Sequence, residues 1–169
     1  PSSAASDVYK RQLQASTTVF PNMELKQIFD GYWSAMDIHR NNAFSSVAME
    51  AAFNEGEEWL EQVLEYISGN FDYIRDYCAE HIPEIKPSVP DATYLVWLDC
   101  RALGLDDEAL KEFMVKKAKL GLNPGSGFTR SLTGFMRLNA ACPRPVIKRA
   151  MEQLKDAVNA LKREGVNHA

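Results

Sequence analysis

The sequence predicts an α+β fold, in which helices cover one small sheet. Two apolar runs predict the main strands. Residues 93–98 read TYLVWL, which is rich in β-branched and aromatic side chains, and residues 134–141 read GFMRLNAA. Apolar residues at helical spacing predict the helices, most regularly at positions 60, 64, 67, 71, 74 and 78. From about residue 86 onward, these patterns indicate one compact unit.

Composition narrows the class of protein. The 169 residues are 46% hydrophobic and 25% charged, which is typical of a folded protein, and we expect a cytoplasmic one. The net charge of −4 argues against nucleic acid as a partner, and no apolar run is long enough to cross a bilayer. The three cysteines and three histidines are scattered. This spacing predicts neither a disulfide framework nor a metal site.

The N-terminal third divides into two segments. Residues 1–12, PSSAASDVYKRQ, are small, polar and aperiodic, and we interpret them as a non-native leader, with a native flexible N-terminus as the alternative. In residues 13–44, a β-prone run at 15–20 precedes a helix that Asn22 caps. The apolar face of this helix carries Leu25, Ile28, Phe29, Trp33 and Met36. One strand and one helix cannot bury a core alone, so residues 13–44 are expected to close a larger domain.

Residues 45–82 are predicted to form a long interdomain helix, which Gly56 loosens without ending. Its apolar stripe suits either a coiled coil or a helix packed against a domain. The flanking charges show no orderly pairing, which favours the packed helix. Residues 83–169 form the expected small C-terminal domain. Its first helix begins at the acidic residues 106–108 and buries Leu110, Phe113, Met114 and Ala118.

The last helix is predicted to begin at Pro145 and to fray after Lys162. Its apolar face carries Val146, Ile147, Ala150, Met151, Leu154, Ala157, Val158 and Leu161.

Arg137 is the strongest candidate for a binding residue. It lies in the middle of the apolar run at 134–141, and an unpaired buried charge is costly. A guanidinium on a rigid strand is suited to bind a carboxylate through two hydrogen bonds. A structural ion pair with a nearby acid is the alternative. The loop 123–127, NPGSG, lacks the Lys-Ser/Thr of a phosphate loop, so we interpret it as a turn.

These segments also resemble a known family. The stretch TYLVWLDCRALGLDDEALKEFMVKKAKLGLNPG, followed by GFMRLNAACPR, resembles the C-terminal domain of fold type I pyridoxal 5'-phosphate (PLP) enzymes. It is most similar to the cystathionine β-lyases of the MalY/PatB group, within the class I/II aminotransferase superfamily. The resemblance extends upstream through EAAFNEGEEWLEQVLEYISGNFDYI to residue 13.

The resemblance implies roles for several residues. Arg137 matches the arginine that binds the substrate α-carboxylate, and the loop containing Asn123 and Gly125 leads toward the active-site mouth. Residues 40–44, RNNAF, match a stretch that approaches the cofactor phosphate of the partner subunit, which implies a homodimer. The chain departs from the family at residues 129–132, TRSL, where relatives carry glycines. Loop shape and substrate preference are therefore expected to differ there.

The resemblance places the Schiff-base lysine just before Leu13. Lys10 lies nearby, but its context, VYKRQ, differs from the family motif, so no catalytic residue is assigned and the chain alone is expected to be inactive. The implied function is that of a fragment of a PLP-dependent carbon–sulfur β-lyase, which converts cystathionine or cysteine S-conjugates to thiol, pyruvate and ammonia. The alternatives are a fragment of a PLP-dependent aminotransferase and a non-catalytic α+β interaction module.

Overall fold

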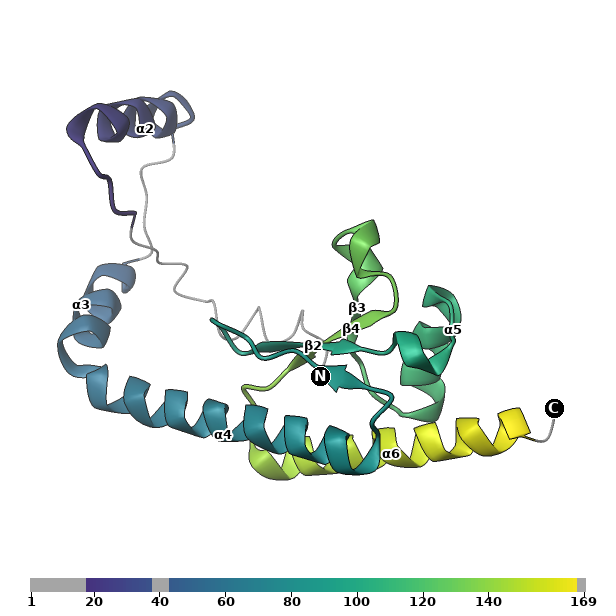
Figure 1. Ribbon diagram of the computed structural model, residues 1–169. Coiled ribbons are helices and arrows are strands. Elements are labelled where there is room, and N and C mark those ends of the chain that lie inside the picture. The colour runs from purple at the N-terminus through teal and green to yellow at the C-terminus, as the bar shows by residue number, and fades with distance from the viewer. Residues whose placement is uncertain (1–17, 38–42, 167–169) are drawn as a thin grey trace. The chain divides into compact units, whose positions relative to one another are not determined.

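The computed structural model describes residues 18–37 and 43–166 (Figure 1). The chain divides into two compact units, Pro1–Glu61 and Gln62–Ala169, and each is described by itself. The predictions for the leader at 1–12, and those for residues 40–42 of the RNNAF stretch, lie outside the described residues.

The first unit contains α2 (Met23–Ala35) and α3 (Ser45–Glu55). Asn22 caps α2 as predicted, because its Oδ1 accepts a hydrogen bond from the Leu25 N–H at 2.9 Å. No residue of α2 is buried. Residues 18–20, the described part of the β-prone run, form no strand. A single strand has no neighbour to complete its backbone hydrogen bonds, so a local β preference is not sufficient.

Two helices take the place of the single long helix expected over residues 45–82. The helix α3 ends at Glu55, and α4 (Glu57–His81) begins directly after Gly56. The Gly56 N–H still bonds to the Ala52 carbonyl oxygen at 3.1 Å, but a Cβ at Gly56 would lie only 2.4 Å from that oxygen. The backbone at this position is therefore too tight for a side chain. The boundaries of the domains, as opposed to the helices, stay predictions.

The second unit contains a four-stranded antiparallel sheet in the order β1-β2-β4-β3. Its strands are β1 (Lys86–Pro87), β2 (Leu95–Asp99), β3 (Asn123–Pro124) and β4 (Phe135–Asn139). The two runs predicted as strands form the central pair, with Val96 opposite Leu138 and Leu98 opposite Met136. The edge strands are short, and each contains a proline, which has no N–H to extend the pairing.

One side of this sheet, which we call the core face, packs against helices. The core face carries Val96, Leu98, Met136 and Leu138, all at most 3% exposed. Figure 1 shows α4 and α6 (Arg144–Val166) running along the same side of the sheet. The helix α5 (Asp107–Glu112) and the π-helical turn η2 (Phe113–Lys117) complete the core. This arrangement is the predicted α+β fold, with helices layered on a small sheet.

The predicted helix faces are confirmed in part. Along α4, residues 67, 74 and 78 are buried, whereas Leu60 and Leu64 are 50% and 57% exposed, so the later part of the helix packs on a domain. The four residues predicted to be buried at 110–118 are at most 6% exposed. On α6, Ile147, Met151, Leu154, Ala157 and Val158 are buried, whereas Val146 is 41% exposed. Contrary to the expected fraying after residue 162, α6 continues to Val166.

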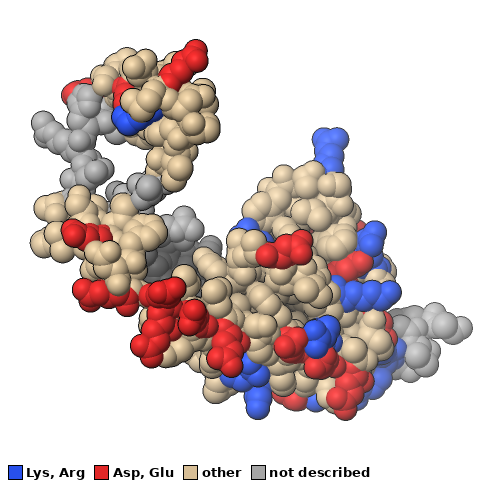
Figure 2. Space-filling model, turned by 60° about the vertical axis from the view of Figure 1, so that its left-hand side comes forward, with Lys and Arg blue, Asp and Glu red and all other residues tan. Residues whose placement is uncertain are grey.

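The described helices and surface carry no sign of a membrane span or a metal site. No helix within residues 18–37 and 43–166 is long and apolar enough to span a membrane. In the same ranges, no group of three or more His, Cys, Asp and Glu side chains could hold a metal ion. Basic and acidic side chains are mixed over the larger unit on the face that Figure 2 draws.

Candidate substrate-binding site

Arg137 lies at the centre of β4, between two residues of the core face. Side chains alternate along a strand, so Arg137 points to the opposite side of the sheet from Met136 and Leu138. The register pairs Arg137 with Trp97 on β2 and with Asn123 on β3. These three residues form a row across the sheet, and we call the side on which they lie the Arg137 face.

An aromatic ring from a loop covers the guanidinium. The Cζ atom of Arg137 lies 4.4 Å from the centroid of the Phe128 ring, a cation–π distance. The Phe128 ring in turn meets Trp97 edge-on, with centroids 5.6 Å apart and an interplanar angle of 86°. The Phe128 side chain is 53% exposed. The loop and the sheet together therefore form a partly open aromatic wall beside the guanidinium.

Arg137 has no carboxylate partner among the residues that the structure describes. Its Nε is buried and makes no hydrogen bond within this part of the chain. The described ion pairs do not include it either, so the alternative of a structural ion pair finds no support there. Buried donors are normally satisfied, and a guanidinium offers five of them. Arg137 is therefore available to bind a small anionic group.

The loop at residues 125–134, here called the Phe128 loop, is internally bonded. It contains the 3-10 turns η3 (Gly125–Gly127) and η4 (Arg130–Leu132). The Phe128 N–H bonds to the Gly125 carbonyl at 2.9 Å. A Cβ at Gly125 would lie 2.3 Å from the Leu132 carbonyl oxygen, so only glycine fits where the two turns touch. Of the predicted loop residues, Asn123 joins the row beside Arg137, whereas Gly125 shapes the turn.

A second charged group lies on the same side of β2. The Asp99 carboxylate, which ends the strand, pairs with the Arg101 guanidinium at 2.7 Å. Hydrogen bonds from this guanidinium hold the pKa of Asp99 below its usual range. The Arg101 Cζ lies 4.9 Å from the Phe135 ring centroid. The charges of Asp99 and Arg101 compensate each other. The charge of Arg137 has no such partner among the described residues.

Sequence reasoning missed Trp97 and the direct contact of Phe128 with the guanidinium. Alternation within TYLVWL placed Trp97 opposite Val96 and Leu98, which was a usable signal for its side of the sheet. Its pairing with Arg137 depends on the register of two strands about 40 positions apart, which the chain's local pattern does not contain.

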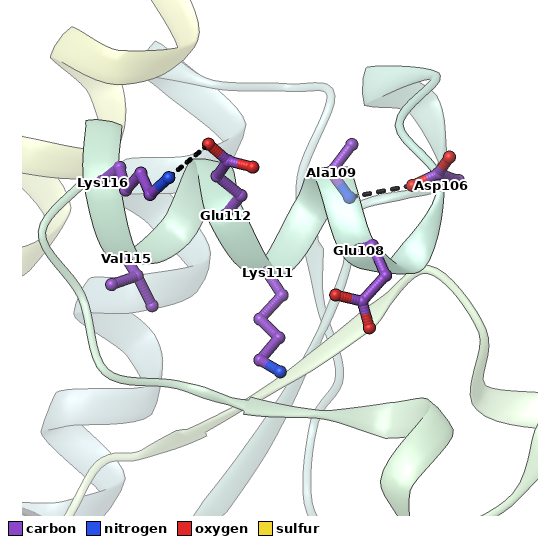
Figure 3. A pocket seen from close by; sticks show the side chains of 7 residues that line it. All are labelled: Asp106, Glu108, Ala109, Lys111, Glu112, Val115 and Lys116. Atoms are coloured by element: carbon purple, nitrogen blue, oxygen red, sulfur yellow. Dashed lines mark hydrogen bonds and ion pairs between the residues drawn. The ribbon is translucent and has the colours of Figure 1, made fainter.

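A separate hollow lies beside α5 and η2 (Figure 3). Both acidic and basic side chains line it, and Lys116 pairs with Glu112 at 2.7 Å. Arg137 and its neighbours do not line this hollow. Glu112 and Lys116 are both exposed and neutralise each other, and nothing in the hollow points to a ligand.

Comparisons with known proteins find relatives that match most of this chain. No family model matches the chain. It is 35% identical over 147 residues to the cystathionine β-lyase PatB of Bacillus subtilis, covering 87% of this chain and 38% of that protein. It is 31% identical over 154 residues to the protein MalY of Escherichia coli, covering 89% of this chain and 40% of MalY. The chain thus spans about two fifths of the length of these relatives.

A solved structure is also similar to most of this chain. A PLP-bound protein from Clostridium difficile 630, which carries an unproven assignment as an aminotransferase, superimposes with a TM-score of 0.79 and 42% identity. The match covers 83% of this chain and 36% of that protein. Over the part that it spans, the chain is homologous to the MalY/PatB-type cystathionine β-lyases, and its fold is that of the C-terminal region of fold type I PLP-dependent enzymes.

Proposed function

We propose that the full-length protein is a PLP-dependent carbon–sulfur β-lyase, in which Arg137 binds the α-carboxylate of the amino-acid substrate. The observation that carries this proposal is the guanidinium on β4 with a buried, unpartnered Nε and no acidic partner in the described parts of the chain. Homology to cystathionine β-lyases supplies the class of reaction. The expected substrates are cystathionine and cysteine S-conjugates, and the expected products are thiol, pyruvate and ammonia.

Arg137 would orient the substrate. Two parallel hydrogen bonds from a guanidinium fix both oxygens of a carboxylate, and so they also fix the direction of the Cα–H bond. Correct orientation of the bond that breaks can supply several kcal/mol of barrier reduction. Phe128 and Trp97 restrict the guanidinium from one side and exclude water there. Because water screens charges, its exclusion would strengthen the attraction between the guanidinium and a bound carboxylate.

The groups around Arg137 fit a substrate carboxylate better than they fit the cofactor itself. Among the described residues, Trp97 and Asn123 pair with it across the sheet and the Phe128 ring covers it, and none of these is a lysine that could form a Schiff base. PLP, when bound, would stabilise the negative charge that develops at Cα. This chain would contribute the binding and orientation of the carboxylate, and the resemblance assigns the lysine to another part of the full-length protein.

Product analysis of the full-length protein tests the proposal. We expect pyruvate, thiol and ammonia from cystathionine without any added keto acid. Arg137→Ala should raise the KM for substrates with an α-carboxylate by at least about tenfold, since a charge-assisted bidentate contact is lost. Arg149→Ala, which removes an exposed arginine from α6, is the matched control and should leave KM unchanged. An unchanged KM in Arg137→Ala would return Arg137 to a structural role.

An aminotransferase is the second candidate, supported by the PLP-bound C. difficile relative. The same Arg137 would serve it, because both reactions start from an α-amino acid. The need for a co-substrate distinguishes the two candidate activities. An aminotransferase forms a new amino acid only when a keto acid is added, and it releases no thiol. If neither reaction occurs, the non-catalytic interaction module becomes the better interpretation.

We also propose that the full-length protein is a cytoplasmic homodimer, which its homology to PLP enzymes that act on small amino acids supports. The expected inactivity of the chain alone rests on the resemblance, which assigns it no Schiff-base lysine.

A further inference from the structure

We propose that Asp107 is a positioning residue for the substrate-binding site. It holds the Phe128 loop in the conformation that places the Phe128 ring against the Arg137 guanidinium. The anchoring of the loop rests on geometry alone. Its consequence for substrate binding rests on the function proposed for Arg137.

Asp107 connects α5 to the far end of the Phe128 loop. Its Oδ1 accepts a hydrogen bond from the Gly134 N–H at 2.9 Å, across 27 positions in the sequence. This hydrogen bond holds the pKa of Asp107 below its usual range. The carboxylate therefore ties α5 to the end of the loop that joins β4.

The peptide groups of Gly134 are fixed on two sides. Its N–H is bonded to Asp107, and its carbonyl oxygen accepts the Cys100 N–H at 2.9 Å. Its φ of +79° favours glycine, and a Cβ would lie 2.6 Å from the Arg101 Cγ. Gly134 immediately precedes β4. The anchor therefore acts where the loop joins the strand that carries Arg137, three positions further on.

Burial does not hold Phe128 in place, because its side chain is 53% exposed. Its position depends on the loop backbone and on the contacts with Trp97 and Arg137. When a loop loses an end constraint, it gains conformations in which such exposed contacts open. Loss of the Asp107 anchor should therefore uncover the guanidinium and broaden its range of orientations.

The chain offers a matched control in Asp106. This neighbouring carboxylate caps α5 by accepting the Ala109 N–H at 2.8 Å, as Figure 3 shows. Asp106 and Asp107 each accept one backbone N–H, but Asp106 bonds to its own helix and Asp107 to the loop. An effect of helix stability alone should appear at least as strongly in Asp106→Ala. An effect on the loop should appear only in Asp107→Ala.

The experiment has two arms on the full-length protein. In the first, phenylglyoxal modifies arginine side chains, and mass spectrometry follows the rate at Arg137 relative to Arg149, which is exposed on α6 and lies outside the loop. We expect Arg137 to be modified several-fold faster in the Asp107→Ala protein than in wild type. In the Asp106→Ala protein, the rate at Arg137 should equal that of wild type. In the second arm, Asp107→Ala should raise the KM for cystathionine about tenfold with kcat within about twofold, in line with the loss of one hydrogen bond to a charged group.

Two more variants keep the test decisive if Asp107→Ala does not fold. Asp107→Asn retains one acceptor for the Gly134 N–H, so it should shift both readouts less than alanine does. Phe128→Leu removes the ring while the anchor stays, so it should speed modification of Arg137 and raise KM.

The outcomes separate this inference from the proposed function. If the wild-type protein acts on no amino acid, the proposed function fails, and the modification arm still decides whether Asp107 positions the loop. Equal modification rates in the Asp107→Ala and Asp106→Ala proteins would overturn the anchoring. An unchanged KM in an active, folded Asp107→Ala protein would overturn the positioning role even if the loop loosens.

Discussion

The two faces of the small sheet differ although the same two strands build both. On the core face, Met136 and Leu138 of β4 are at most 3% exposed and pack with Val96 and Leu98. On the Arg137 face, the intervening residue is a partly buried arginine whose neighbours are aromatic or polar. Alternate residues of β4 thus serve stability, and the residue between them is the one proposed to bind substrate. Changes on the two faces should therefore have different consequences.

The largest effect on stability is expected on the core face. Leu138→Ala removes a buried side chain that is 3% exposed, and it should lower the free energy of unfolding by about 3 kcal/mol. Arg137→Ala, one position away, should lower it by less than about 1 kcal/mol, because it removes mainly a cation–π contact. Urea unfolding of both variants measures the difference. Equal losses would mean that Arg137 is part of the structural core.

An intermediate effect is expected where a buried polar group supports the core face. Asn70 on α4 is fully buried, and its amide donates to the Ala140 and Cys142 carbonyl oxygens at 2.7 and 3.0 Å. Its Oδ1 accepts a hydrogen bond from the Arg144 Nε. Asn70→Ala leaves these groups without their partner, so the free energy of unfolding should fall by about 2 kcal/mol.

Tyr66→Phe provides the control for Asn70. The Tyr66 hydroxyl accepts the Arg144 N–H at 2.7 Å, but the Tyr66 side chain is 47% exposed, so water can replace it. The loss in Tyr66→Phe should therefore be clearly smaller, which the same unfolding measurement shows. A loss as large as that of Asn70→Ala would mean that Arg144, rather than Asn70, is the important member of the cluster.

The smallest effect is expected from the ion pair on the Arg137 face. Asp99→Asn removes the charge that pairs with Arg101 but keeps an oxygen for the Arg101 N–H, which bonds to Oδ1 at 3.1 Å. The folded-state pKa of Asp99 is lowered, so its stabilisation is present at pH 7 and lost as the pH falls through that lowered pKa. Thermal unfolding should show a small difference between variant and wild type at neutral pH that vanishes in acid. A difference independent of pH would point to the hydrogen bonds rather than to charge.

Sequence patterns predicted the core face better than the Arg137 face for a physical reason. Burial of apolar side chains imposes a periodicity that is local in sequence, so Leu110, Met114 and Leu154 could be assigned to the core directly. The position of Arg137 on a strand followed from its apolar neighbours in the same way. Gly56 shows the limit of such reasoning, because the contact of its backbone with Ala52 has no signature in the apolar stripe.

The candidate site depends on contacts between distant segments. Trp97 reaches Arg137 through strand register, Phe128 through the shape of a loop, and Asp107 through a hydrogen bond to Gly134. No periodic pattern in the sequence indicates any of these contacts. At the sequence level, Asp107 was only an acid favourable to a helix start, and its bond to the loop required the folded geometry.

The alternation of β4 has a consequence for folding. A shift of one residue in its pairing would turn the arginine toward the helices and expose Met136 and Leu138 to solvent. An isolated charge in that interior would be strongly unfavourable, by several kcal/mol. The guanidinium thus penalises misaligned sheets during folding, and the residue proposed for substrate recognition also helps to select the correct strand alignment.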